Sequence, residues 1–292
     1  MSVLLGLLAA ATYGSSDFLA GLASRRLPAI VVTAAAQVIC LLVGLVAIVF
    51  YPGDGIGAKV LLWGAAAGLG SAGGMFALYR GLGGGEMSVV ATLSGLLTAV
   101  IPVIVGLATG DSLTALAAIG IVAAIPAIGL VSWSEADGGE AGSGALWGTL
   151  AGFGFGLLFV GYDRAGAGAG AWPLVVAEGT ASLLTIGPAL RALRLAAARD
   201  AGDDRAGAGS GSERRAVSLL LAAGLLAGAA NLSFLVANHH GELAVVAVLT
   251  ALYPGFTVIL ARVVLGERWS PAQKLGLATA LLATFLVSLG SA

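Results

Sequence analysis

Long runs of apolar residues dominate the chain, and each is close to the length needed to cross a membrane. A helix needs about 20 mostly apolar residues to span the hydrocarbon core. Ten runs approach or exceed this length, at 3–22, 29–50, 60–82, 87–109, 114–133, 145–163, 172–193, 217–238, 242–264 and 272–290. They lack the in/out alternation of a membrane β-strand, so helices are predicted. The predicted fold class is therefore an all-α integral membrane protein with about ten transmembrane helices.

The polar breaks between the runs are short, with one exception. Residues 196–216 read AAARDAGDDRAGAGSGSERRA, which is small, polar and mixed in charge. Such a composition cannot bury enough apolar surface to order a chain, so we predict a disordered surface loop here. The fifth and sixth runs are near the minimum length, which leaves nine or eleven crossings open.

The pattern of the first half recurs in the second. GEMSVVATLSGLL around Glu86 matches GELAVVAVLTALY around Glu242, an offset of 156 residues. Nearer the front, Gly6 and Gly14 match Gly148 and Gly156 at an offset of 142. The loop at 196–216 accounts for the difference. We predict two five-helix repeats, 1–134 and 145–292, joined by a short linker.

An odd number of helices in each repeat has a topological consequence. The second repeat enters the membrane from the opposite side, which makes the two repeats inverted. Inverted repeats are typical of secondary transporters, whose solute site lies near the midplane where the halves meet. The repeat therefore predicts alternating access to a central site.

Composition supports the membrane prediction and removes some function classes. Only 10% of the residues are charged, against about a quarter in soluble proteins. The net charge of −1 argues against a nucleic-acid partner. Cys40 is the single cysteine, so a disulfide within the chain and a cysteine metal site are excluded.

The order of these motifs resembles the EamA group of the drug/metabolite transporter superfamily. The resemblance is carried by the five-plus-five arrangement, the GE(M/L)xVVA segments, a proline in the fourth helix of each repeat (Pro102, Pro254) and the Leu265-Gly266-Glu267-Arg268 segment. It implies an exporter of metabolites, amino acids or drugs, driven by protons or another gradient. Thr109-Gly110-Asp111-Ser112 departs from the expected Leu-Gly-Glu-Arg in the first repeat, and the two prolines are not at equivalent positions.

Asp17 is the first candidate for a functional charge inside the bilayer. A charge at the bilayer centre costs about 2.5–3.5 kcal/mol on insertion scales, so such residues are usually functional. Gly14 and Gly21 share its helix face and either pack closely or leave room for a ligand. Asp17 would be a proton site or a contact for a cationic group. Alternatively, it pairs with Arg25 or Arg26 near the interface.

Glu178 is the second candidate, about seven residues inside its run. At the offset of 142, Ala36 takes its place in the first repeat, with Gln37 next to it. A polar residue on the second helix of both repeats suggests that Glu178 and Gln37 belong to one substrate or proton site.

Other candidates have a strong structural alternative. Glu86 and Glu242 are the repeat-motif acids, and a carboxylate at a helix N-terminus is favoured by the helix dipole in any case. The remaining candidates for a polar cavity are neutral and could equally hold helices together: Asn231, Asn238, Ser233, Ser94, Thr98 and Tyr253. We expect no catalytic residues, no metal site and no cofactor.

Competing functions lack their required motifs. The runs contain no convergent catalytic acids and histidines, so a membrane enzyme is disfavoured, and no GxxxxGK is present for an ATP-driven pump. A flippase for a lipid-linked small molecule stays open as an alternative. The expected partners are a small solute and the lipid bilayer, with a homodimer left open. The expected location is the plasma membrane, and the bacterial inner membrane in particular.

The distribution of basic residues predicts the orientation. On the ten-helix arrangement, even-numbered connections hold only Lys59 and Arg164, the termini hold none, and odd-numbered connections hold twelve: Arg25, Arg26, Arg80, Arg191, Arg194, Arg199, Arg205, Arg214, Arg215, Arg262, Arg268 and Lys274. Cytoplasmic loops collect Lys and Arg. The count therefore places both termini outside, whereas the family resemblance implies that both are cytoplasmic.

Overall fold

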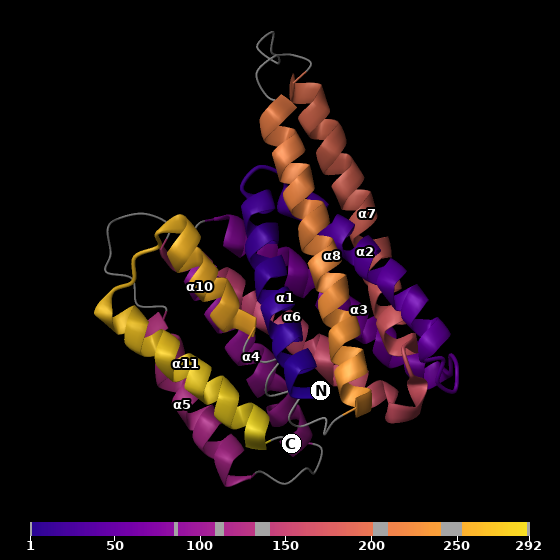
Figure 1. Ribbon diagram of the computed structural model, residues 1–292, viewed down its shortest axis with the longest axis vertical. Coiled ribbons are helices and arrows are strands. Elements are labelled where there is room, and N and C mark those ends of the chain that lie inside the picture. Colours follow the sequence, from indigo (N-terminus) through magenta and orange to yellow (C-terminus); the bar gives the residue numbers. More distant parts are fainter. Residues whose placement is uncertain are drawn as a thin grey trace.

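The architecture is helical throughout the part of the chain that the computed structural model describes, residues 2–84, 87–108, 114–131, 141–200, 210–240 and 253–290 (Figure 1). Its elements are α1 (Ser2–Ser24), α2 (Ala29–Phe50), α3 (Ala58–Gly83), α4 (Met87–Ala108), α5 (Ala115–Val131), α6 (Ala141–Ala165), the 3-10 turn η1 (Ala167–Ala169), α7 (Trp172–Asp200), α8 (Ser210–His240), α10 (Tyr253–Leu265) and α11 (Pro271–Gly290).

The helices coincide with the predicted apolar runs, with one correction. The prediction of a disordered loop over 196–216 is wrong at both ends, because α7 continues to Asp200 and α8 begins at Ser210. Alanine and arginine, which dominate 196–199, are strong helix formers, so the helix continues past its apolar stretch. Residues 201–209 lie outside the described residues. The ninth run is described only from Tyr253 onward, as α10.

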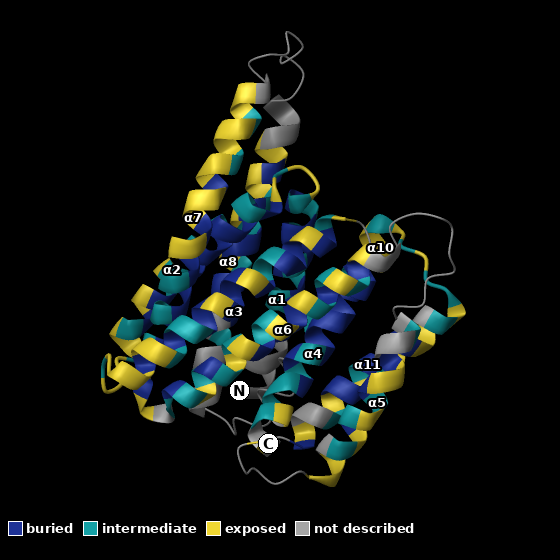
Figure 2. Ribbon diagram, turned by 180° about the vertical axis from the view of Figure 1, so that it is seen from behind, coloured by how far each residue is buried: buried dark blue, intermediate teal, exposed yellow. Residues whose placement is uncertain are grey.

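Length and composition suit several of these helices to a membrane. Within the described residues, four are long and apolar enough to cross one, Ala29–Phe50, Ala58–Gly83, Ser143–Ala165 and Trp172–Ala198. Large apolar side chains also cover the outside of the molecule, including Leu183 at 82% exposure and Val49 at 76%. Figure 2 shows exposed residues along the outward faces of the helices. Lipid, and not water, is the solvent that suits this surface.

The helices form one bundle, with different helices grouped at its two sides. In Figure 1, α7, α2, α8 and α3 lie together on one side, α1 and α6 follow, and α5 and α11 lie side by side at the opposite edge. Helices α4 and α10 lie between these two groups and contact each other. The central helices therefore bring segments from both predicted repeats together.

Helix contacts between the two repeats come in equivalent pairs, in which each helix is replaced by its counterpart in the other repeat. α3 packs on α6, and α8 packs on α1 in the same way. α3 also packs on α7, while α8 packs on α2. The second helices of the two repeats contact each other, as do the fifth helices, α5 and α11.

Glycine permits the closest of these contacts. A Cβ added at Gly154 of α6 would lie 2.5 Å from the Gly74 Cα and 2.7 Å from the Gly70 O of α3. Both neighbours are backbone atoms, so neither can move aside as a side chain would. Gly152, part of a GxxxG pair, would meet Leu97 and the Ser94 O of α4. Glycines at this spacing commonly allow membrane helices to pack closely, which fits these contacts.

Candidate functional site

Asp17 lies where helices of both repeats meet. It is seven residues from the end of α1, about 10 Å along the helix axis. A Cβ at Gly14, one turn away, would meet Phe256 and the Tyr253 O of α10, and one at Gly21 would meet Leu82 and Met87. The two glycines thus serve close packing, and they place the half-buried Asp17 between α1, α3 and α10.

Three tyrosines from three helices lie within electrostatic range of this carboxylate. Tyr13 of α1, Tyr79 of α3 and Tyr253 of α10 are each close enough to interact electrostatically with Asp17. The rings of Tyr13 and Tyr253 lie 6.2 Å apart at an angle of 60°. Tyr79 is fully buried, and its hydroxyl has no hydrogen-bond partner in the described part of the chain. Asp17 therefore lies within electrostatic range of three tyrosines, and one of these has a buried hydroxyl without a partner in the described part of the chain.

The alternative interpretation of Asp17, an interfacial ion pair, is not supported. Arg25 and Arg26 follow the end of α1 and are exposed. Among the described residues, Asp17 forms no ion pair and no hydrogen bond. Its charge is thus left without a counter-ion from those residues.

Glu178 occupies a second, more deeply buried site. Its side chain on α7 is 5% exposed, and Ser71 of α3 donates a hydrogen bond to its Oε1 at 3.4 Å. The Gln37 Nε2 of α2 donates in turn to the Ser71 Oγ at 3.3 Å. The Glu178 Oε2 and the Gln37 Oε1 have no partner within the described residues. A single hydrogen bond from a neutral hydroxyl offsets little of the free-energy cost of burying a carboxylate.

This chain of hydrogen bonds joins the two residues that the repeat singled out. Gln37 and Glu178 come from equivalent helices, α2 and α7, which pack against each other. Ser71 bridges them from α3. The offset between repeats identified the pair, whereas Ser71 could not have been identified from sequence because no spacing marks it. The same is true of Tyr13 and Tyr79.

The neutral candidates fall into two groups. The Tyr253 hydroxyl lies near the hydroxyls of Ser94 and Thr98 on α4, so these three residues come together. Thr98 also donates to the Ser94 O of its own helix at 2.7 Å. Asn231 and Asn238 lie on α8, and their side chains are outside the described residues, whereas Ser233 is half-buried. Glu86 and Glu242 also lie outside the described residues.

A contact that the sequence did not predict joins the repeats at one end of the bundle. Glu267 follows Gly266, whose φ of 66° ends α10 in the left-handed conformation that glycine adopts readily. The Glu267 carboxylate accepts hydrogen bonds from the Ser88 N–H, at 3.3 Å, and from the Ser88 hydroxyl. Trp269 donates to the same hydroxyl at 3.0 Å, and Arg262 lies 5.5 Å from the Trp269 ring. An acid of the second repeat thus caps α4 of the first.

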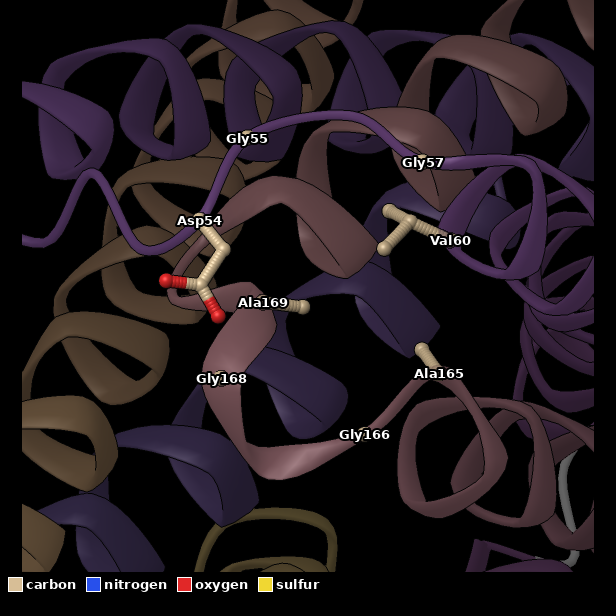
Figure 3. Close-up of a pocket in the computed structure, with 8 residues that line it drawn as sticks. All are labelled: Asp54, Gly55, Gly57, Val60, Ala165, Gly166, Gly168 and Ala169. Carbon is tan, nitrogen blue, oxygen red and sulfur yellow. The ribbon is translucent and has the colours of Figure 1, made fainter.

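A cavity of about 250 Å³ lies at the opposite end, between the α2–α3 and α6–α7 connections. Figure 3 shows its lining: Asp54, Gly55, Gly57, Val60, Ala165, Gly166, Gly168 and Ala169. Asp54 supplies the single charged group of this lining, and its N–H donates to the Gly168 O. None of the predicted site residues lies here, so we do not assign this cavity a site.

Comparisons with known proteins agree with this picture. The sequence profile of the EamA-like transporter family matches residues 142–289. No curated protein matches the chain. One solved crystal structure, described simply as that of a protein, aligns over 99% of this chain and 97% of its own at 18% identity, with a TM-score of 0.56. That similarity shows a shared fold over the full length.

Proposed function

The chain belongs to the EamA-like transporter family, and from this premise we propose that it is a secondary active transporter exporting a small metabolite, amino acid or drug. Members of this family are transporters and not enzymes. The helices and the family together make this a multi-pass membrane protein. The proposal adds an alternating-access mechanism and coupling to protons.

The observation that carries the proposal is the pair of acids inside the bundle. Asp17 and Glu178 are both uncompensated by any described basic residue. Charges in such places are costly and are found where a solute or a proton passes. A purely structural membrane bundle would be more stable without either of them.

Packing between the repeats supports alternating access. The helix pairs exchange between repeats, as two equivalent halves in an inverted arrangement would require. The Ser88–Glu267 contact holds the halves together at one end. In the proposed cycle this contact breaks when that end opens, and a corresponding contact forms at the other end.

Glu178 is the proposed proton site. Its hydrogen bond to Ser71 links it to Gln37, so a change in its charge would act on α2, α3 and α7 together. A proton bound there removes the cost of the buried charge and leaves a hydroxyl that can donate. Such a coupled element between helices of both repeats is what proton-driven exchange requires.

Three further parts of the proposal concern context. The location is the inner membrane of a bacterium, and a homodimer stays a prediction. A flippase for a lipid-linked small molecule is the alternative, and it differs in moving a lipid from one leaflet to the other instead of a soluble solute across the membrane.

Export by cells tests the proposal. We would compare, by untargeted mass spectrometry, the medium of cells producing the wild-type protein with that of cells producing Asp17→Asn/Glu178→Gln. The proposal predicts that at least one small solute is enriched several-fold in the medium of cells producing the wild-type protein, and not in the medium of cells producing the double variant. Equal media at equal amounts of membrane-inserted protein would contradict it.

A further inference from the structure

Two helices extend past the rest of the bundle at one end, and exposed arginines lie where they leave it. Helices α7 and α8 have 29 and 31 residues, so each is about 45 Å long, whereas the hydrocarbon core of a bilayer is about 30 Å thick. Figure 1 shows the end of α7 and the start of α8 beyond the other helices at the top of the view. We propose that this end binds the headgroups of anionic phospholipids through five exposed side chains, the belt arginines: Arg25, Arg191, Arg194, Arg214 and Arg215.

A contact between α1 and α8 places their arginines at one height. Ser16 of α1 donates a hydrogen bond to the Ala223 O of α8 at 2.8 Å, so these two residues are level. The two helices run in opposite directions, because α1 ends and α8 begins at this end of the bundle. Arg25 and Arg214 are each nine residues from the contact (16 to 25, and 223 to 214), which is about 13 Å along the helix axis. Arg25 and Arg214 are therefore level with each other.

A contact between α2 and α7 brings Arg191 to the same height. A Cβ added at Gly44 of α2 would lie 3.2 Å from the Val175 Cγ2 of α7, so these two residues are level. Helix α2 begins at Ala29, 15 residues before Gly44, and Arg191 is 16 residues after Val175 on the antiparallel α7. Arg191 is thus level with the start of α2, which follows closely after Arg25. The belt arginines come from helices of both repeats and share one level, with Arg194 one turn farther out.

No described acid pairs with a belt arginine. In the part of the chain that the structure describes, the ion pair is that of Arg164 with Asp163, at the other end of the bundle. Asp200 is six residues past Arg194, about 9 Å farther from the bundle along α7. Residues 191–215 hold six arginines against four acids, whose side chains lie outside the described residues. Positive charge therefore exceeds negative charge at the level of the belt.

Exposed leucines lie between the arginines of α7. Leu190, Leu193 and Leu195 are between 44% and 52% exposed. Such leucines are unfavourable in water, whereas the membrane interface accommodates both kinds of side chain, because leucine reaches the acyl chains while the guanidinium group extends to the phosphates. This mixture favours a lipid over a soluble anion or an acidic protein as the ligand.

Arginine is well suited to the phosphate of a lipid headgroup. Its planar guanidinium group stays charged and can donate two parallel hydrogen bonds to phosphate oxygens. Phosphatidylglycerol carries an uncompensated negative charge, whereas the choline of phosphatidylcholine cancels that of its phosphate. A basic residue near an anionic surface strengthens binding about fivefold. The belt should therefore select phosphatidylglycerol, and this selection does not depend on which solute the protein moves.

Lipid selectivity of the full-length protein in vesicles tests the inference. Spin-labelled phosphatidylglycerol and phosphatidylcholine with identical acyl chains are added to vesicles of unlabelled phosphatidylcholine, and electron spin resonance measures the fraction of each label that the protein immobilises. Both leaflets contain the label, so the orientation of the protein does not affect the result. We expect an association constant at least threefold larger for phosphatidylglycerol. This ratio should fall towards one as NaCl rises from about 50 to about 500 mM, because salt screens exposed charges.

Variants locate the selectivity on the belt. Arg191→Gln/Arg194→Gln and Arg214→Gln/Arg215→Gln should each lower the ratio by about half, and the quadruple variant should bring it close to one. Arg191→Lys/Arg194→Lys keeps the charge and should keep most of the selectivity.

The matched control removes two basic side chains from the opposite end, where Lys59 begins α3 and Arg164 ends α6. Lys59→Gln/Arg164→Gln should leave the ratio unchanged. A wild-type ratio near one would overturn the inference. So would a ratio that both belt double variants leave unchanged at wild-type unfolding temperature, or one that the control lowers as much as they do.

Discussion

At the scale of single residues, depth along a helix identified the two acids but not their surroundings. Asp17 and Glu178 stand out in sequence because charges are rare in the apolar runs. The structure adds that Asp17 is among tyrosines, whereas Glu178 is held by Ser71. The two acids look alike in sequence but have different proposed functions. Asp17 is proposed to act in solute binding, and Glu178 in proton coupling.

Removing either charge should slow transport without unfolding the protein. We expect Asp17→Asn and Glu178→Gln each to reduce the transport rate at least fivefold, since each keeps the shape of the side chain and loses its charge. Transport by each reconstituted variant, at equal protein in the vesicles, measures this. Asp163→Asn serves as the control for an exposed carboxylate. Wild-type rates in both interior variants would refute the role of these acids.

The sequence could identify Gln37 and Glu178 as related positions because the repeat offset compares one half with the other. It could not identify Ser71, Tyr13 or Tyr79. Serine and tyrosine are ordinary in membrane helices, and no local spacing reports which side chain of a distant helix they will meet. Contacts of this kind depend on the packing of three helices at once.

At the scale of helices, glycine determines which faces approach most closely. Gly154 of α6 lies against the backbone of α3 at Gly70 and Gly74. In contrast, Gly73, on the neighbouring position of α3, has no atom within 4 Å of an added Cβ. The two positions offer a matched pair for testing this packing.

Gly154→Ala should destabilise the protein while Gly73→Ala should not. The added methyl at position 154 would overlap backbone atoms, and overpacking of this kind costs about 1–3 kcal/mol. We expect the unfolding temperature in detergent to fall by several degrees for Gly154→Ala and to change little for Gly73→Ala. Equal unfolding temperatures would show that α3 and α6 are not packed as described.

The Ser88–Glu267 contact should control opening of one end of the bundle. Glu267→Gln removes a charge that is favourable at the N-terminus of α4, worth about 0.3–1 kcal/mol, and weakens its hydrogen bonds. Spin labels at Arg25 and Arg268, both exposed, would report the separation of the repeats by electron spin resonance. We predict a larger population at long distance in Glu267→Gln. An unchanged distribution would mean that the contact does not hold this end closed.

At the scale of the whole molecule, the run lengths and the repeat predicted ten helices close to where they are found. The failure at 196–216 has a simple cause, because a composition that cannot form a core can still extend an existing helix. The packing order of the helices was beyond sequence reasoning, since apolar runs carry no information about their neighbours. The inverted relation of the repeats stays a prediction.

Orientation in the membrane is a second whole-molecule prediction. Of the basic residues, twelve lie in or beside odd-numbered connections, several of them within the helix ends, and two lie in or beside even-numbered ones, which predicts that the termini are outside. We would replace Ser210 by cysteine in a background that lacks the buried Cys40. Intact cells would then be treated with a membrane-impermeant thiol reagent. We expect labelling only after lysis. Labelling of intact cells would show that the connection between α7 and α8 is outside, as the usual topology of the family requires.

The most direct test of the central claim is the release of solute by the purified protein. Proteoliposomes containing the wild-type chain, the Asp17→Asn/Glu178→Gln variant or no protein would be loaded with a small-molecule extract of cells, and the retained contents measured by mass spectrometry. The account predicts that one or a few small solutes are depleted from wild-type vesicles and kept in the other two. Identical contents in all three sets of vesicles would contradict it.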